Sequence, residues 1–325
     1  MTRLLSRDDV NSLLDPGAVI GAVASACLAA AQGRTQTPLR AAVPSLTGDG
    51  VLLAMPGAMR DPSILGTKIV TVFGGNAARG LPRVASLYVL SDPETGMPEA
   101  VMDGTAITGA RTAAASAVAT DHLARPDART LGMFGTGVQA RAHVAMIARV
   151  RRIDEVLVTG RTREASLEFA AWVTRSHQVS ARAVDAREAA AADIVACCTT
   201  STIPLFDTVS PGAHVNAVGA FAPDSREVPT DIIVDSAVYV DTREGAFAEA
   251  GDLLIPVAEG RFTLDRVVGE IGEVVAGTVS GRHALPEGAV TVYKSVGAAF
   301  LDAATARLVV DLARARGIGH EFRFL

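Results

Sequence analysis

The sequence has few of the residues that build disulfides and metal sites. It contains three cysteines and six histidines in 325 residues, and neither type recurs at the spacing of metal ligands. Three cysteines form no even disulfide framework, which predicts a reducing compartment. We therefore expect no metal, and we interpret the adjacent Cys197 and Cys198 as small hydrophobic residues of a buried strand, DIVACCTT.

Targeting and membrane segments are lacking as well. The stretch 17–31 is apolar, but three aspartates precede it, and it is too short to span a bilayer. Its small residues indicate a helix packed in a core. The net charge of -5 disfavours general affinity for nucleic acid or an anionic membrane. We expect a cytoplasmic protein whose partners include neither.

Lysine is almost absent: of the 30 basic residues, only Lys68 and Lys294 are lysines. Arginine stays charged in any protein environment, whereas a desolvated lysine can lose its proton and serve as an acid. Both lysines lie in apolar segments, TKIVTVF and VYKSVG. Because a buried ammonium is costly unless it is paired or used, we predict a functional Lys68. The alternative is an edge-strand lysine whose ammonium reaches solvent.

The most informative motif lies in residues 130–140, TLGMFGTGVQA. A short apolar strand leads into Gly135-x-Gly137-x-x-Ala140 and then into a helix, and a second strand, EVLVTG, follows about one helix later. In such a unit the first glycine permits a tight turn, the second lets the backbone approach a pyrophosphate, and the third small residue lets the helix pack closely. This context favours a dinucleotide site over an ordinary glycine turn.

The end of the second strand indicates which dinucleotide is bound. An acidic residue there would hold the free ribose hydroxyls of NAD, whereas an arginine accommodates the 2′-phosphate of NADP. The strand ends in Thr159-Gly160-Arg161-Thr162, and the guanidinium of Arg161 suits a phosphate. We therefore favour NADP(H) over NAD(H). The alternative is that Arg161 is a solvated loop residue.

The apolar patterns predict two regions of different architecture. Residues 35–105 contain short apolar runs separated by Gly and Pro, which is typical of hairpin-linked strands. From about 118 to 290, strands and helices alternate, which predicts a doubly wound parallel sheet. Its strands are LGMF, EVLVTG, SARAV, DIVACCTT, HVNAVGA and IIVDSAVYVD. The final segment, GAAFLDAATARLVVDLARAR, is an amphipathic helix that we expect to return and cover the first sheet.

Two further charges stand out. Arg111 is the only charge in the segment 105–120, a run of small and apolar residues, so its guanidinium must meet an anion. That anion is either an acidic side chain such as Asp103 or a substrate carboxylate. Asp224 follows the fifth predicted strand of the nucleotide domain, on the side where ligands of doubly wound sheets bind. Its position after Pro223 also fits a plain turn.

These motifs together resemble the ornithine cyclodeaminase/mu-crystallin family along nearly the whole chain. The matching segments are the MPG of residues 55–57, DGTAITGARTAAAS, GTGVQA, PDSRE and KSVGAAFLD. The resemblance implies an α/β protein with a Rossmann dinucleotide-binding domain, 118–296, and a discontinuous α+β substrate-binding and dimerisation domain, 1–117 and 297–325. It also implies a homodimer that acts on small α-amino or α-imino acids with a nicotinamide coenzyme.

The resemblance also assigns roles to individual residues. Arg40, Lys68 and Arg111 match the basic group that holds the substrate carboxylate and polarises its nitrogen or carbonyl, and Asp224 matches an acid that moves protons. We add Met55 of the MPG motif to the substrate site. The expected cofactor-binding residues are Gly135, Thr136, Gly137, Val138 and Gln139 in the pyrophosphate turn, Arg161 and Thr162 at the ribose, Thr199, and Lys294 and Ser295 in a loop near the nicotinamide.

One departure from the family pattern bears on the reaction. Ornithine cyclodeaminases carry a glutamate two residues before the methionine of Met-Pro, and here that residue is Leu53. Leucine cannot pair with the distal amine of ornithine, and burying that amine unpaired would cost several kcal/mol. We therefore predict an oxidoreductase that reduces an α-imino acid, such as pyrroline-2-carboxylate, or runs the reverse dehydrogenase reaction. The alternatives are an NAD-dependent cyclodeaminase and an NADPH-binding protein without turnover.

Overall fold

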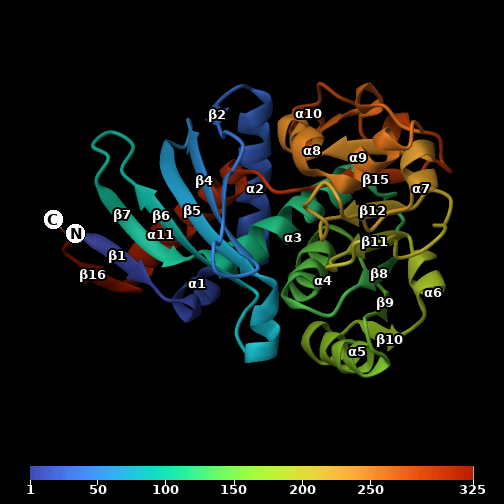
Figure 1. The fold of residues 1–325 in the computed structure, drawn as a ribbon, viewed down its shortest axis with the longest axis horizontal. Helices are drawn as coiled ribbons and strands as arrows, with labels where there is room; N and C mark the ends of the chain where they lie inside the picture. Colours follow the sequence, from blue (N-terminus) through green and yellow to red (C-terminus); the bar gives the residue numbers. More distant parts are fainter. Residues whose placement is uncertain (325) are drawn as a thin grey trace. The chain divides into compact units, whose positions relative to one another are not determined.

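The computed structural model describes residues 1–324 and divides the chain into two compact units (Figure 1). Unit 1 comprises Met1–Arg111 and the chain from Ala298 onward, and unit 2 comprises Thr112–Gly297. The first division falls within helix α3 (Gly104–Leu123), which also contains the boundary expected at 117/118. The protein is an α/β structure with a Rossmann domain and a second domain, as predicted.

Unit 1 is built on a mixed sheet with strand order β16-β1-β7-β6-β5-β4-β2, in which β3 also pairs with β4. Its strands are β1 (Thr2–Leu5), β2 (Thr35–Gln36), β3 (Ala41–Pro44), β4 (Gly50–Met59), β5 (Ile64–Phe73), β6 (Val84–Ser91), β7 (Pro98–Asp103) and β16 (His320–Phe322). The antiparallel run from β2 to β7 confirms the predicted hairpin-linked strands. Strands β1 and β16, at one edge, were not predicted.

Helices cover one face of this sheet. They are α1 (Arg7–Leu13), α2 (Pro16–Ala31) and α11 (Ala299–Arg316), and a 3-10 helix, η1 (Gly74–Arg79), joins β5 to β6. Helix α2 begins with an Asp15 cap and Pro16, and α11 ends at Gly317 in the left-handed conformation. Helix α11 packs on α2, β4, β5 and β6, so the predicted return of the last helix and the predicted core helix at 17–31 are confirmed.

Within residues 1–324, no single helix has the length and apolar character to cross a membrane. Helices α1 and α2 meet the length and composition criteria only as a pair, and that pair is bent by 87°.

Unit 2 is a doubly wound sheet of eight strands in the order β10-β9-β8-β11-β12-β15-β13-β14. Its strands are β8 (Thr130–Phe134), β9 (Glu155–Thr159), β10 (Ser180–Ala183), β11 (Ile194–Cys197), β12 (His214–Ala217), β13 (Ala237–Val240), β14 (Gly269–Glu270) and β15 (Thr291–Lys294), and every neighbouring pair is parallel. Its helices are α4 (Val138–Val150), α5 (Arg163–His177), α6 (Ala186–Ala190), α7 (Thr230–Asp235), α8 (Arg243–Glu249), α9 (Gly251–Ala258) and α10 (Ile271–Val275), with 3-10 turns η2 (Leu264–Arg266) and η3 (Arg282–Ala284).

The chain leaves β8 in one direction and β11 in the other, so the order reverses between these two neighbouring strands. This reversal defines the Rossmann arrangement, whose ligands bind at the carboxyl ends of the strands beside the switch.

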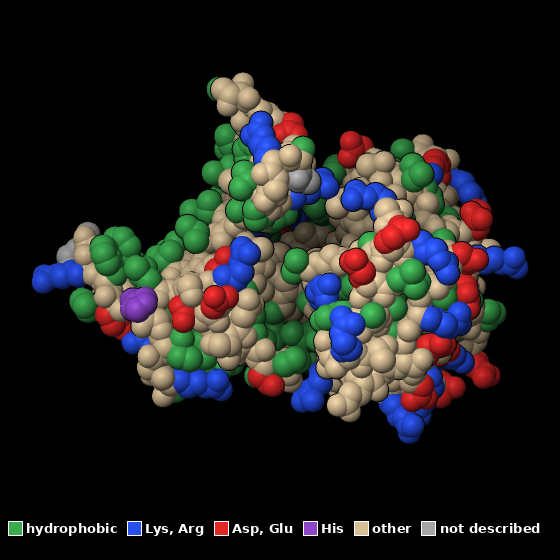
Figure 2. Space-filling model, turned by 90° about the horizontal axis from the view of Figure 1, so that it is seen from below, with side chains coloured by type: hydrophobic (Ala, Val, Ile, Leu, Met, Phe, Trp, Pro, Cys, Tyr) green, Lys and Arg blue, Asp and Glu red, His purple; other side chains and the backbone are tan. Residues whose placement is uncertain are grey.

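On the face seen in Figure 2, acidic and basic side chains are interspersed, in agreement with the modest net charge of -5.

The sequence prediction was wrong at two places in unit 2. Residues 232–241 do not form one strand: the first part belongs to α7, and β13 begins only at Ala237. Helix α7 begins after Pro229, whose ring restricts its backbone and which has an extended conformation. The helix ends at Ser236, which is also extended. Second, Lys294 lies not in a loop but at the end of β15, an inner strand between β12 and β13. The apolar residues that precede Lys294 are buried on both faces, as an inner parallel strand requires.

Candidate active site

The glycine turn of unit 2 follows β8 at the switch point. Gly135 has φ +109°, which favours glycine, and a side chain there would place its Cβ 2.7 Å from the carbonyl oxygen of Cys198, directly after β11. The amide of Gly135 also donates to the carbonyl of Thr159, the last residue of β9. The turn is therefore held against the ends of both strands that flank β8.

Gly137 begins helix α4 and provides the anion-binding features of the turn. It is the N-cap residue, no side chain caps the helix, and no atom lies within 4 Å of the position that a Cβ would occupy. No side chain therefore occupies the N–H groups of the first turn, and the free space beside Gly137 fits the close approach of a pyrophosphate. Ala140 is fully buried in the core beneath the helix, whereas Val138 is 70% exposed. The residues present therefore fit a bound dinucleotide.

The ribose end of the expected cofactor site lies after β9. A Cβ on Gly160 would lie 2.9 Å from the methyl group of Thr136, so this turn packs closely on the glycine turn. Arg161 is exposed, and the hydroxyl of Thr162 accepts a hydrogen bond from the amide of Ala165 as the cap of α5. The nearest acid of the strand, Glu155, lies at its other end and pairs with Arg182.

A buried charge cluster occupies the covered face of the unit 1 sheet. Nζ of Lys68 on β5 lies 2.9 Å from each carboxylate oxygen of Asp302 on α11. Nε of Arg111 on α3 donates to Oδ1 of the same aspartate at 3.0 Å. Lys68, Arg111 and Asp302 are 2%, 5% and 0% exposed. Strand β5, helix α3 and helix α11 therefore each contribute one charged residue to a single buried cluster.

The partner of Arg111 differs from the acid suggested by the sequence. Arg111 meets an anion within the fold, as predicted, but this anion is Asp302 and not Asp103. Asp103 immediately precedes α3, where its Oδ1 accepts the amide of Ala106 at 2.7 Å and its Oδ2 contacts Arg7. It is thus engaged as a helix cap. Asp302 was missed, although it is the only charge in the apolar segment GAAFLDAATA, which is the same signal that singled out Arg111.

The electrostatics of the cluster favour a lysine that can exchange its proton. The pKa of Lys68 is lowered to about 8, because burial and the positive charges of Arg111 and Arg40 outweigh the opposing effect of Asp302. Burial alone would raise the pKa of Asp302, but Arg111 and Lys68 hold it below its usual value. Two cationic side chains, Lys68 and Arg111, thus bind one carboxylate, an arrangement that attracts a further anion.

Apolar residues surround the cluster on the sheet. Met55 on β4 and Tyr88 on β6 are the direct cross-strand neighbours of Lys68, and both are buried. Leu53 lies two residues before Met55 and packs in a cluster with Met55, Val70 and Ala299. These four apolar side chains provide no partner for the ammonium group of a substrate.

The loops after β11 and β12 hold the remaining predicted residues of unit 2. Asp224 is exposed on the loop after β12. The hydroxyl and amide of Thr199, on the loop after β11, both donate to the buried Glu227. Lys294 is fully buried, pairs with Asp252 at 2.7 Å and donates to the carbonyl of Ala220. Its ammonium is therefore occupied by groups within unit 2.

Ser295 follows Lys294 and is bonded internally as well. Its hydroxyl donates to Oδ2 of Asp241 at 2.8 Å, and the same oxygen accepts the amides of Val296 and Gly297. Asp241 directly follows β13, so this bonding fixes the chain where it leaves β15.

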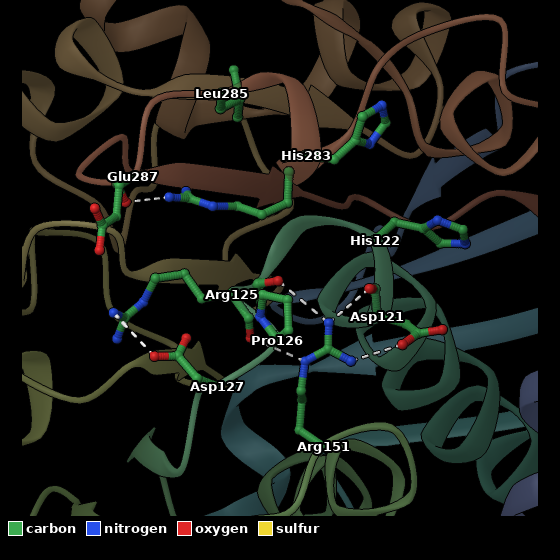
Figure 3. Close-up of a pocket in the computed structure, with 11 residues that line it drawn as sticks. Asp121, His122, Arg125, Pro126, Asp127, Arg151, His283, Leu285 and Glu287 are labelled. Atoms are coloured by element: carbon green, nitrogen blue, oxygen red, sulfur yellow. Dashed lines mark hydrogen bonds and ion pairs between the residues drawn. The ribbon is translucent and has the colours of Figure 1, made fainter.

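A cavity of about 460 Å³ lies elsewhere in unit 2 (Figure 3). Its lining includes Arg125, which precedes β8, and Leu285, which precedes β15, so it lies at the amino ends of the strands. Arg151 in its wall donates to the carboxylate of Asp121 and to the carbonyls of Arg125 and Ala124. Because these charges are already paired and ligands of such sheets bind at the carboxyl ends, we do not assign the cofactor here.

Comparisons with known proteins extend over the whole chain. A model of the ornithine cyclodeaminase/mu-crystallin family matches residues 1–317. Delta(1)-pyrroline-2-carboxylate reductase of Bacillus cereus is 35% identical over 325 residues, which cover 99% of each chain. The solved structure of Thermococcus litoralis Delta(1)-pyrroline-2-carboxylate reductase in complex with NADH and L-proline has a TM-score of 0.96 and 36% identity, covering 99% of this chain and 100% of that one. An archaeal alanine dehydrogenase dimer with bound NAD gives a TM-score of 0.94 and 32% identity, covering 100% and 99%.

Proposed function

Because the chain belongs to the ornithine cyclodeaminase/mu-crystallin family, we propose that it reduces the C=N bond of a small cyclic α-imino acid to the amino acid. The protein is an NAD(P)-dependent oxidoreductase, and the reverse reaction oxidises the CH–NH bond. The observation that carries the proposal is the buried centre of Lys68, Arg111 and Asp302, in which cations outnumber the carboxylate. The relatives named above, two of which are pyrroline-2-carboxylate reductases, support this substrate class.

The substrate carboxylate binds to the guanidinium of Arg111. Nε of Arg111 donates a hydrogen bond to Asp302, and the two terminal nitrogens of the guanidinium make no hydrogen bond to a residue among 1–324. A guanidinium held at Nε presents these nitrogens as a fixed pair of donors, which matches a carboxylate. Arg40, which is close enough to lower the pKa of Lys68, adds positive charge to the same anion.

Lys68 supplies the proton. Reduction adds a hydride to the carbon of the C=N bond and a proton to its nitrogen, so the enzyme needs an acid whose pKa lies near the working pH. Burial gives Lys68 a pKa of about 8. A bound nicotinamide supplies the hydride, and the pyrophosphate turn from Gly135 to Gln139 would hold it in unit 2. We assign Asp224 to proton exchange with the product amine.

The competing reaction, cyclodeamination of ornithine, is disfavoured by the apolar cluster. The distal ammonium of ornithine would face Leu53, Met55 and Val70, which are buried side chains without a negative charge. An unpaired ammonium in such surroundings costs several kcal/mol. The ring of a cyclic imine carries no distal charge and packs on these side chains.

A spectrophotometric assay separates the two reactions. Incubated with pyrroline-2-carboxylate, the protein oxidises one NAD(P)H for each proline formed. Incubated with ornithine, it releases no ammonia. Ammonia release without net change in the coenzyme would contradict the proposal, and so would the absence of turnover with cyclic and open-chain imines.

For the coenzyme we propose a preference for NADP(H), which rests on Arg161. This residue is exposed directly after β9, and the start of that turn has no acidic residue. We expect Arg161→Ala to weaken NADPH binding by about 10- to 100-fold, the worth of charge-assisted hydrogen bonds to a phosphate, and to leave NADH binding unchanged. Fluorescence titration of both coenzymes measures this ratio. An unchanged ratio would overturn the preference, and Arg187→Ala, at an exposed position on α6, is the control.

We also propose that the protein is a homodimer formed by unit 1, while unit 2 binds the coenzyme. The face of the unit 1 sheet opposite α11 exposes apolar side chains on neighbouring strands. These are Leu52, Leu65, Ile69 and Leu87, which are 40%, 40%, 41% and 53% exposed. Ile69 and Leu87 are direct cross-strand neighbours. Exposed apolar side chains gathered on one face of a sheet mark a contact surface, and a second copy would bury them symmetrically.

The dimer prediction is tested by a charge placed in this patch. We expect the wild-type chain to sediment as a dimer and Leu87→Asp to sediment as a monomer, because the interface would then bury an unpaired carboxylate. Leu167→Asp is the matched control, since Leu167 is 50% exposed on α5 of unit 2. A dimeric Leu87→Asp, or a monomeric wild type, would contradict the proposed surface.

A further inference from the structure

Unit 2 contains a second buried charge cluster, made of Glu227, Asp252 and Lys294, each 0% exposed. None of these side chains belongs to the glycine turn or to the charge centre of unit 1. Lys294 pairs with Asp252 at 2.7 Å, and one oxygen of Asp252 accepts the backbone amides of Glu227 and Val228 at 2.7 and 2.9 Å. Burying three charges is costly, so this cluster needs an explanation.

Glu227 joins two loops at the carboxyl edge of the sheet. Its Oε1 accepts the amide and the hydroxyl of Thr199, on the loop after β11, at 2.8 and 2.6 Å. Its Oε2 accepts the amides of Gly219 and Ala220, on the loop after β12, at 2.7 and 3.3 Å. Four donors thus converge on one carboxylate.

Close backbone packing reinforces this junction. A Cβ on Gly219 would lie 2.3 Å from the carbonyl oxygen of Thr199 and 2.5 Å from Oε1 of Glu227. A Cβ on Gly251 would lie 2.1 Å from the carbonyl oxygen of Ser225 and 2.7 Å from that of Ala222. The segment 219–228, which carries Asp224, is therefore clamped against the Thr199 loop on one side and against the start of α9 on the other.

We propose that Glu227 is a positioning residue, which fixes Asp224 and Thr199 relative to each other for the reduction. Asp252 and Lys294 complete this clamp: Asp252 orients the backbone of Glu227, and Lys294 supplies the positive charge. The inference rests on the proposed function, since it assigns the residues that orient the same site. It also explains the second of the two lysines as a buried counter-ion that does not touch the coenzyme.

The charge balance explains why lysine is required in this place. Burial and the nearby Asp252 raise the pKa of Glu227, while Lys294 and the bonds from Thr199 oppose this rise. The Lys294 ammonium lies among Asp252, Glu227 and the carbonyl of Ala220, and the last accepts a hydrogen bond from it. A compact ammonium fits this enclosed volume, whereas a planar guanidinium is larger and needs more acceptors.

The test is a double-mutant cycle between Glu227→Gln and Asp224→Asn. The amide side chain of the first variant can accept on one side only, so one of the two loops is released. We expect each single variant to lower kcat for imine reduction by about 10- to 100-fold. Because both changes impair the same group, the double variant should be no more than about threefold slower than Asp224→Asn alone.

The control is Glu259→Gln, which removes a carboxylate that binds Arg226 and Thr230 beside the clamp but outside it. Its kcat should match that of the wild type. If Glu227→Gln does not fold, Thr199→Val removes the hydroxyl bond to Glu227 with little change in volume and takes its place in the cycle.

Four outcomes are decisive. An inactive wild-type enzyme refutes the proposed function itself. With an active wild type, an unchanged kcat for Glu227→Gln overturns the positioning role. A double variant whose loss is the product of the two single losses also overturns it, because a general structural role acts independently of Asp224. Wild-type kcat in Asp224→Asn overturns it as well, since the clamped loop would then carry no functional acid.

Discussion

Lys68→Met abolishes imine reduction while the protein still folds and binds its coenzyme. We expect kcat to fall by roughly 100- to 10,000-fold, the usual contribution of a general acid. Methionine has nearly the length of lysine and is apolar, so it fits the buried site between Met55 and Tyr88. Asp302 keeps the hydrogen bond from Arg111 at 3.0 Å and is not left unpaired. Coenzyme affinity should stay within about threefold, because the glycine turn belongs to unit 2.

Single-turnover kinetics, thermal unfolding and coenzyme titration together measure this outcome. The matched control is Arg307→Met, which removes a cation of α11 that pairs with Glu99 at 2.7 Å. This change should lower stability without lowering kcat. If Lys68→Met lost folding and coenzyme binding together with turnover, or if it retained turnover, the lysine would be structural.

Asp302→Asn has the second large effect, on both pH dependence and stability. In the wild type, reduction requires protonated Lys68, so kcat/KM is constant below a pH of about 8 and falls as the pH rises through it. Asp302 raises the pKa of Lys68 through its charge and its hydrogen bonds. Without that charge, the falling limb should move to lower pH by about one to two pH units.

The same substitution leaves two buried cations without a counter-ion. We expect it to lower the free energy of unfolding by about 3–5 kcal/mol at neutral pH, as measured by urea denaturation. The comparison variant is Asp311→Asn, since Asp311 lies on the same helix and pairs with Arg307 near the surface at 2.6 Å. Its stability should change by less than about 1 kcal/mol. A falling limb that stays near pH 8 in Asp302→Asn would show that Lys68 is not the titrating group.

Two residues of the buried charge cluster in unit 1 could be predicted from the sequence, but their shared partner could not. Lys68 and Arg111 were recognisable because each is the single charge of an apolar segment, and a buried charge must be paired or used. The pairing partner was not predictable, because Arg111 and Asp302 are 191 residues apart in the chain and meet only when α11 returns to the sheet. Asp103 is close to Arg111 in the sequence, but its carboxylate caps α3.

In unit 2, local chemistry predicted the turn better than the strands. Gly135 and Gly137 were identified because their positions impose conformations and clearances that other residues do not tolerate. Strand β15 and helix α7 were not, because short apolar runs such as 232–235 suit a buried helix as well as a buried strand. The clamp around Glu227 could not be predicted, because its members come from four segments that only the folded sheet brings together.

A crystal structure of the protein with NADP+ and L-proline tests the central claim most directly. The account predicts that the proline carboxylate lies within hydrogen-bond distance of both terminal nitrogens of Arg111, and that the ring nitrogen lies within reach of Nζ of Lys68. Proline bound away from these two side chains, with Lys68 and Arg111 still engaged only by Asp302, would contradict it.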